Sequence, residues 1–554
     1  MFLFIISIGA VFFAVQPLLK PGFIPTHDGE YHLIRFYEFE TMLRAGYWFP
    51  RWAPGLNSGY GLPLFNFHYP FPNYLGALYH SLGWSLSDAF KLALATGYLS
   101  AGLFCYLWLS KIFDKFSGAV GTIAFLFVPY WFVELYVRGS VGEVIAIAWF
   151  MLVLAAIEYR NGALVSVATA GMILSHNILS MVFLPILVCY MFLRNRRQLL
   201  SIAIGFGLSS YFWIPALWER NFVVGLNVVN FREHFPELFQ LLIPLGGTNF
   251  SQAGAPEGEM SQQLGVMTIV VGMFALAFGV GEKEQRLKRL IGGSLSLFVL
   301  VTIVMLAISQ PVWEAFAALQ LLQYPWRLLA VVVPLVGLLA AYLGYRLRSR
   351  WIGIVIALMF IGFSLPYTKP VTYAPRDDRY YLSRREFTDG TSSLGNSFST
   401  VWSPWKSNRA VPLVDVLQGK GTAAVQSQKP LIIRLVADIE EDATMRVNVL
   451  YFPGWTVTIE GIQQVIDYKK DGTVSFPIGK GNHAVDVFFK ETPVRAVADV
   501  LSIASLLWVF CSTILKRAIQ LSFPSLASAR DRPAESRVSK LDPRVKPEDD
   551  REKI

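Results

Sequence analysis

A carboxylate, an imidazole and a guanidinium occur at helical spacing near the start of the chain. Asp28, His32 and Arg35 stand at positions i, i+4 and i+7, so a helix would place them on one face. A carboxylate can take a proton from a hydroxyl, and a guanidinium matches the oxygens of a phosphate. Asp28 has a second interpretation, because aspartate at the start of a helix also serves as its cap. The residues alone leave both roles open.

Other polar residues interrupt apolar segments, where an unpaired polar group is costly. Arg138 and Glu143 bracket a short turn, where they either form an ion pair with each other or bind a substrate. His176 either hydrogen-bonds a neighbouring helix or binds a head group. Arg327 directly follows a tryptophan and either anchors the span at the membrane boundary or binds a phosphate. We predict catalysis by Asp28 and substrate binding by Glu30, His32, Arg35, Arg51, Arg138, Glu143, His176 and Arg327.

The composition is that of a polytopic membrane protein. The chain has 554 residues, of which 54% are hydrophobic and 16% are charged, whereas soluble domains carry about 25% charged residues. The net charge of +9 comes from short basic clusters between apolar runs. That pattern is typical of cytoplasmic loops and not of a nucleic-acid surface. The three cysteines lie in apolar runs without metal-ligand spacing.

The elements that must position the polar residues are membrane spans. Residues 1–367 are predicted to form a multi-span α-helical domain with a first outer loop over 20–87, and a last span covers 496–516. About twelve spans, with both termini in the cytoplasm, put every short basic cluster inside. Residues 54–82 are rich in proline, glycine and aromatic side chains, so we expect them not to cross. Most candidate site residues then share the outer side.

A second domain is predicted before the last span. From 431 to 495 apolar and polar residues alternate, and turn signals such as Asp471-Gly472 separate the runs. This pattern predicts a small antiparallel β-sandwich outside the membrane. Residues 368–430 are predicted to be an extracytoplasmic linker, and the proline-rich, charged residues 517–554 a disordered cytoplasmic tail.

Five motifs, taken together and in order, resemble those of a known family. They read THDGEYHLIRFYEFETMLRAGYWFPRW, GYGLPLFNFHYPFPNYLGALYHSLG, SHNILSMVFLP, LQYPWRLLA, and YFPGWTVTIEG with the strand GNHAVDVFF. The pattern resembles bacterial YfhO-like membrane proteins and the related membrane proteins labelled 6-pyruvoyl-tetrahydropterin synthase-related. That family in turn resembles the GT-C superfamily of integral-membrane glycosyltransferases.

The resemblance implies a function at the outer face of a bacterial plasma membrane. GT-C enzymes carry an acidic catalytic residue soon after the first span, a position that matches Asp28. The resemblance implies a polyprenyl-phosphate sugar donor and a glycan, lipid or protein acceptor. Asp28 would then act as base, and Arg327, with Arg35 or Arg138, would stabilise the departing phosphate, with inversion at the sugar carbon. No Gly-rich nucleotide loop of the Walker type is evident, which agrees with a lipid-linked donor.

A metal ion is a further expectation of the resemblance. Some GT-C enzymes use a divalent cation such as Mg²⁺ or Mn²⁺ and others do not. His27, Asp28, Glu30 and His32 offer ligand atoms. The family's first loop often carries a pair of acids, whereas Gly29 follows Asp28 here, so the ligand set is incomplete at that position.

Two other functions are compatible with the sequence. A transporter or flippase of lipid-linked sugars would show paired inverted repeats with broken midplane helices, and none is evident. A non-catalytic assembly protein would depend on the domain at 431–495 and not on Asp28. The leading hypothesis is therefore a membrane glycosyltransferase.

Overall fold

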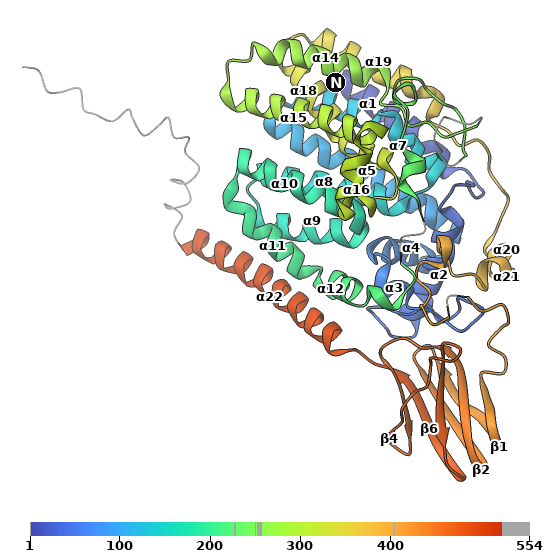
Figure 1. The fold of residues 1–554 in the computed structure, drawn as a ribbon. Coiled ribbons are helices and arrows are strands. Elements are labelled where there is room, and N and C mark those ends of the chain that lie inside the picture. The colour runs from blue at the N-terminus through green and yellow to red at the C-terminus, as the bar shows by residue number, and fades with distance from the viewer. Residues whose placement is uncertain (1, 226–228, 250, 252–257, 404, 523–554) are drawn as a thin grey trace, which may run out of the picture. The chain divides into compact units, whose positions relative to one another are not determined.

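The computed structural model describes residues 2–225, 229–249, 251, 258–403 and 405–522 (Figure 1). The chain divides into two compact units, residues 1–505 and 506–554. Most of the first unit is helical, and an antiparallel sheet precedes the last helix. Of the tail predicted over 517–554, residues 523–554 lie outside the described residues.

The helices differ widely in length. The first outer segment contains α2 (Gly29–Arg44), α3 (Leu64–Phe67) and α4 (Phe71–Ser81). The longer helices are α1 (Phe2–Val15), α5 (Leu86–Ile112), α6 (Lys115–Leu126), α8 (Val141–Glu158), α9 (Gly162–Ser175), α10 (Asn177–Arg194), α11 (Leu199–Leu208), α12 (Ser210–Trp218), α14 (Val266–Val280), α15 (Gln285–Met305), α18 (Leu329–Arg346), α19 (Arg350–Ser364) and α22 (Pro493–Ser522). The short ones are α7 (Pro129–Val133), α13 (Leu238–Leu242), α16 (Gln310–Ala315), α17 (Ala317–Gln320), α20 (Asp378–Leu382) and α21 (Arg385–Thr388).

Apolar length identifies the membrane spans. Among the described residues, 7 helices are long and apolar enough to cross a membrane, or up to 9 if two bent pairs each form one span. One pair bends by 47° between α6 and Pro129–Arg138, where the proline lacks the N–H needed to continue the helical ladder. The other bends by 66° between Arg196–Leu208 and α12. The count of about twelve spans stays a prediction.

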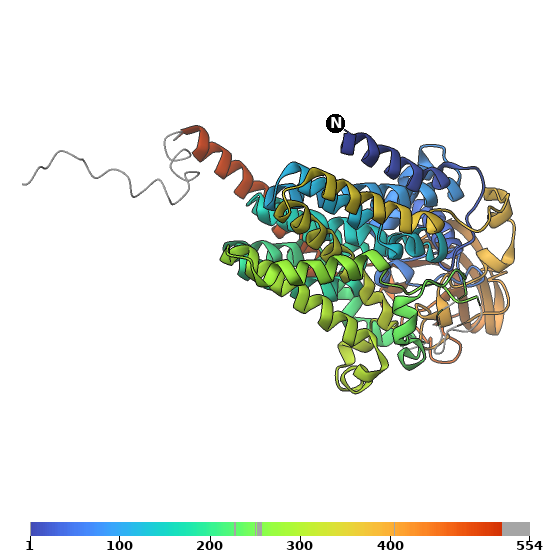
Figure 2. The same cartoon turned by 90° about the horizontal axis from the view of Figure 1, so that it is seen from above.

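Two helices form the centre of the helical bundle. The apolar windows of α8 and of the span Pro325–Arg346, which contains α18, are 83% and 94% buried, whereas those of α15 and α19 are 28% buried. Helix α5 packs on α8, and α6 packs on α18. Figure 2 shows from above how the helices of the bundle lie alongside one another. Helices buried on all sides must be apolar all round, so a polar residue on α8 or α18 requires a partner.

The sheet contains six antiparallel strands. They are β1 (Val414–Lys429), β2 (Ile432–Leu450), β3 (Trp455–Ile459), β4 (Ile462–Gln463), β5 (Thr473–Ile478) and β6 (Gly481–Phe489). The order is β1-β2-β6-β3-β4, and β5 pairs with β2 beyond the end of β6. Its buried face packs on side chains of the first outer segment, where the ring of Trp52 lies 5.5 Å from Trp455 and 5.7 Å from Phe489.

The sheet differs from the predicted sandwich in two ways. All six strands belong to one hydrogen-bonded sheet, because the 19 residues of β2 pair first with β6 and then with β5. The first strand, β1, lies within the range 368–430 that was predicted to be linker. Its sequence VDVLQGKGTAAVQSQK is mostly polar and its side chains are largely exposed, so it lacks the apolar alternation by which a strand is recognised.

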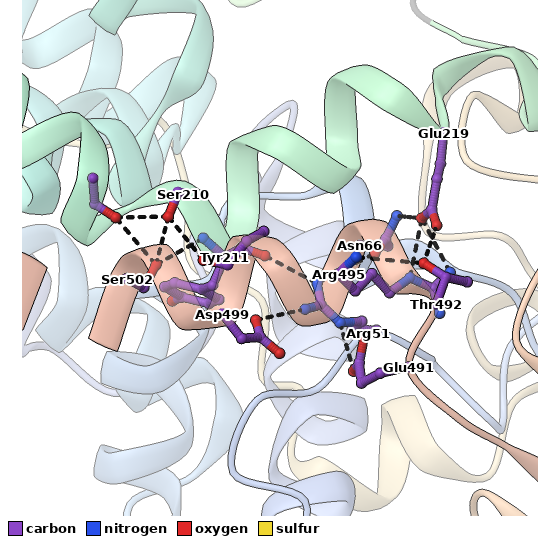
Figure 3. A network of polar contacts seen from close by, with 12 residues as sticks. Arg51, Asn66, Ser210, Tyr211, Glu219, Glu491, Thr492, Arg495, Asp499 and Ser502 are labelled. Atoms are coloured by element: carbon purple, nitrogen blue, oxygen red, sulfur yellow. Dashed lines mark hydrogen bonds and ion pairs between the residues drawn. The ribbon is translucent and has the colours of Figure 1, made fainter. Parts of the chain in front are cut away.

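Ion pairs join α12 and the first outer segment to the start of α22, and the pair from α12 is buried (Figure 3). Glu219, at the end of α12, accepts hydrogen bonds from Nε and Nη2 of Arg495 at 3.1 and 3.0 Å. Arg51 donates to Glu491 at 2.8 Å and to Asp499 at 3.1 Å. Arg495 is 0% exposed, so its charge depends on the Glu219 carboxylate.

We expect Glu219→Gln to lower the free energy of unfolding by about 3 kcal/mol, because it leaves the buried charge of Arg495 without a counter-charge. Asp486→Asn is a matched control, since its pair with Arg434 is exposed on both sides and should cost no more than about 1 kcal/mol. Thermal unfolding of the purified protein in detergent measures both. Equal losses in the two variants would contradict the prediction.

Candidate functional site

A polar cavity of about 160 Å³ lies at one end of the helical bundle. It is lined by the start of α2, the link from α3 to α4, the turn before α8, the break between α9 and α10, the start of the α18 span and residues 393–398. The residues predicted from the sequence that line it are Asp28, His32, Arg35, Arg138, His176 and Arg327. Segments that lie far apart in the sequence therefore contribute to one cavity.

Asp28 stands at the N-cap position of α2, but its side chain makes no capping hydrogen bond. Its own N–H donates to the carbonyl of Arg138 at 2.9 Å. The carboxylate is half-buried and makes no hydrogen bond or ion pair with any residue that the structure describes. Of the two roles that the sequence left open, the structure therefore does not show the cap.

Glu143 lies beneath the cavity and holds two of its arginines. This carboxylate is 0% exposed and accepts from Nη2 of Arg138 at 2.7 Å and from Nε of Arg327 at 2.9 Å. Tyr130 donates to its second oxygen at 3.2 Å. Glu134 pairs with the remaining terminal nitrogen of Arg138. Two guanidiniums are thus fixed side by side by a carboxylate that does not line the cavity.

The guanidinium of Arg327 is only partly used by the protein. Its Nε and Nη1 bond Glu143, the carbonyl of Leu322 at 2.6 Å and Gln323 at 3.3 Å. Its Nη2 makes no hydrogen bond with any of the described residues, although a guanidinium offers five N–H donors. Two such fixed cations in one cavity favour a phosphate or another oxyanion.

Neutral imidazoles form a second wall. Nη1 of Arg35 lies 2.8 Å from Nε2 of His68, and Nδ2 of Asn73 lies 3.1 Å from Nδ1 of the same ring. Burial, followed by the positive charge of Arg35, lowers the pKa of His32 and of His68 well below the ordinary value. Nδ1 of His32 is buried without a hydrogen-bond partner among the described residues. A neutral ring with an unused nitrogen can bond a hydroxyl of a substrate.

Tyr69 lies between the histidines of this wall. Its ring centroid is 4.1 Å from that of His68 and 5.0 Å from that of His176. A Cβ at Gly142 would lie 2.6 Å from the Tyr69 hydroxyl oxygen, so only glycine permits this approach. The first turn of α8 therefore supplies both Gly142, whose missing side chain leaves a gap for the Tyr69 hydroxyl, and the Glu143 carboxylate one residue later.

Besides Glu143, which was predicted to bind substrate but does not line the cavity, two further predicted site residues lie outside it. Glu30 pairs with Arg376 at the protein surface. Arg51 belongs to the ion-pair network at the start of α22 (Figure 3). Both stand near Asp28 in the sequence, but Glu30 points away from the Asp28 face of α2 and Arg51 lies beyond its end. Proximity to Asp28 in the sequence therefore brings neither side chain into the cavity.

The sequence-based analysis missed Tyr31, His68 and Tyr69, which all line the cavity. His68 and Tyr69 belong to the proline-rich, aromatic segment 54–82, which the sequence predicts not to cross the membrane and for which it indicates no site residue. The available signal was the dipeptide His-Tyr directly before Pro70, because a proline disfavours the helical conformation in the residue before it, and α3 ends at Phe67 before α4 begins at Phe71. That short break brings both rings to the cavity.

The candidate metal ligands do not converge. Among the described residues, no group of three or more His, Cys, Asp or Glu side chains could hold a metal ion. Glu30 pairs with Arg376, and Nε2 of His27 contacts the carbonyl of Thr248 at 2.5 Å. The residues named as possible ligands therefore do not fit a divalent cation.

Comparisons with known proteins give partial matches, and no family model matches the chain. An uncharacterized protein of Lactococcus lactis subsp. cremoris (strain MG1363) is 24% identical over 239 residues, and the match covers 39% of this chain and 39% of that protein. The mycobacterial arabinofuranosyltransferase AftD is similar over 69% of this chain and 28% of its own, with 15% identity and a TM-score of 0.45. The Archaeoglobus fulgidus oligosaccharyltransferase is similar over 72% and 57%, with 14% identity and a TM-score of 0.40. The chain spans less than two thirds of the length of each of these proteins.

We expect the neutral histidines to make the protein sensitive to acid. Their pKa is lower in the folded than in the unfolded state, so stability is full above about pH 6.5 and falls as the pH decreases below it. The slope should approach about 1.4 kcal/mol per pH unit for each histidine. Thermal unfolding in detergent between pH 5 and 8 measures it, with the variant His32→Gln/His68→Gln expected to lose the part of the slope that these two histidines contribute and to retain the part from His176, whose pKa is lowered to about 3 by burial.

His483→Gln is the control for this experiment, because His483 lies on β6 and not in the cavity. It should retain the acid sensitivity of the unmodified protein. The same slope in all three proteins would show that other groups cause the acid response.

Proposed function

We propose that the chain is a membrane glycosyltransferase that moves a sugar from a polyprenyl-phosphate donor to a glycan, lipid or protein acceptor. The observation that carries the proposal is one cavity that combines the unpaired carboxylate of Asp28 with the fixed guanidiniums of Arg138 and Arg327. The resemblance of five sequence motifs to YfhO-like and GT-C proteins supports the same reaction. On the predicted topology, the cavity faces the outside of a bacterial plasma membrane.

The donor phosphate is assigned to the arginine side of the cavity. Glu143 holds Arg138 and Arg327 at 2.7 and 2.9 Å in positions that do not depend on a ligand. Preorganised donors of this kind stabilise charge that develops on a leaving group, at no cost of reorganisation during the reaction. Arg35, which also lines the cavity, adds a third positive charge.

The acceptor is assigned to the Asp28 side. Asp28 takes the proton from an acceptor hydroxyl while that oxygen forms a bond to the anomeric carbon of the sugar. The bond between this carbon and the phosphate oxygen breaks, and the phosphate leaves with the electron pair. One direct displacement inverts the configuration at the anomeric carbon. His32 and His68, being neutral, serve as hydrogen-bond partners of sugar hydroxyls and not as additional charges.

The positive charge beside the phosphate is supplied by arginine in this proposal. A divalent cation such as Mg²⁺ or Mn²⁺ would serve the same purpose, but the candidate ligands His27, Asp28 and Glu30 do not form a set. No step therefore passes through a metal ion.

We expect Asp28→Asn to reduce transfer by about 10²–10⁴-fold, because asparagine retains the shape but cannot accept the proton. Asp377→Asn is the matched control: Asp377 is also an N-cap aspartate, but it caps α20 by accepting from the N–H of Tyr380 and lies outside the cavity. The measurement is sugar transfer from polyprenyl-phosphate donors in membranes, with expression checked for each variant. Full transfer by Asp28→Asn would exclude Asp28 as the base.

We expect Arg327→Lys to reduce kcat by about 10²–10³-fold, the usual effect of losing one donor to a developing negative charge. Lysine retains the charge but not the planar fork that bonds Glu143 and a phosphate together. Arg232→Lys is the control, since Arg232 forms an exposed ion pair with Glu314. An unchanged kcat in Arg327→Lys would place the phosphate elsewhere.

A further inference from the structure

An apolar groove of about 1210 Å³ lies apart from the polar cavity. Its walls come from α1, α5, α6 and α19, and the two cavities share no lining residue. Phe12 on α1 and Leu103 on α5 are 61% and 57% exposed along it. On helices that span a membrane, side chains exposed in this way face lipid.

Two of the three hydroxyl-bearing residues that line the groove, Thr96 and Thr122, are already bonded within the protein, and the third is Tyr106. Thr96 and the hydroxyl of Tyr79 lie 2.7 Å apart, and Thr122 donates to the carbonyl of Gly118 at 2.8 Å. The remaining lining side chains along α1 and α5 are mostly apolar. The groove is therefore suited to a hydrocarbon chain, which needs no polar partner.

Two basic residues line one end of the groove. Lys115 is the first residue of α6 and Arg350 the first residue of α19. A Cβ at Gly353 would lie 2.7 Å from the ring of Phe116, so the two helix starts are packed together. Both basic side chains are exposed, and neither has an ion-pair partner among the residues that the structure describes. The neighbouring carboxylate of Asp114 caps α6 by accepting from the N–H groups of residues 116 and 117.

This end of the groove lies across the membrane from the polar cavity. Arg327 stands at the start of the span Pro325–Arg346, and Arg350 follows its end. The 22 residues of that span separate the two by about 30 Å at 1.5 Å per residue. A lipid whose phosphate lies at Lys115 and Arg350 is therefore in the opposite leaflet and is not the donor of the Asp28 cavity.

We propose that this groove is a binding site for an anionic glycerophospholipid. One acyl chain lies along α5 and α6, and the phosphate head group contacts Lys115 and Arg350. The charge of these residues selects an anionic lipid over a zwitterionic one, because basic residues beside an anionic head group each strengthen binding about fivefold. The site is independent of the proposed transfer reaction.

The test is a titration of the full-length protein in detergent with phosphatidylglycerol or phosphatidylcholine, with bound lipid counted by native mass spectrometry. We expect the unmodified protein to bind phosphatidylglycerol about 30-fold more tightly. The variant Lys115→Gln/Arg350→Gln should bind the two lipids equally. If it retains the preference for phosphatidylglycerol, the proposal is wrong.

Two further variants complete the test. Arg196→Gln/Arg197→Gln removes two exposed basic residues that do not line the groove and should retain the preference. If this variant loses the preference for phosphatidylglycerol as fully as Lys115→Gln/Arg350→Gln does, the preference depends only on the net charge of the protein, and the proposed site is wrong. Ala119→Phe fills the groove beside intact basic residues and should weaken the binding of both lipids. Unchanged binding in this variant would show that no chain occupies the groove.

Discussion

The buried carboxylate of Glu143 is the constraint on which the candidate site depends. A charge within a membrane bundle is tolerated only with partners, and Glu143 has Arg138 from the preceding turn and Arg327 from the start of the α18 span. These contacts join two spans that are 184 residues apart in the sequence. They also fix two guanidiniums at the cavity wall before any ligand is present. The same ion cluster therefore stabilises the bundle and supplies the positive surface of the site.

The start of α2 is attached to this cluster through the backbone. The N–H of Asp28 donates to the carbonyl of Arg138, so the carboxylate proposed as base and the arginines proposed as phosphate ligands share one rigid connection. The gap at Gly142 admits Tyr69, which completes the wall with His68. Rigid placement of this kind is what a direct displacement requires, because the attacking and leaving oxygens must lie on opposite sides of one carbon.

The first unit thus has different chemistry at the two ends of its helices. The Asp28 cavity is polar and small, whereas the groove along α1, α5, α6 and α19 is apolar and ends at two basic side chains. The polar cavity lies at the start of the span that contains α18, whose apolar window is 94% buried, whereas α19, which helps to line the groove, begins just after the end of that span. A buried central helix that carries polar groups only at its ends allows two separate sites without placing a charge at mid-membrane.

The sequence by itself determined the membrane class, the long helix over Asp28, His32 and Arg35, and most of the strands after residue 431, because each follows from local periodicity and composition. It also singled out Asp28, Arg138, Glu143, His176 and Arg327, since a charge within an apolar run is visible without a structure. Only the tertiary structure decided that Glu143 supports the arginines, that Arg51 belongs to the network with α22, and that His68 and Tyr69 line the cavity. Whether these residues meet in one cavity depends on how helices that are distant in the sequence pack together, and the local sequence does not specify that packing.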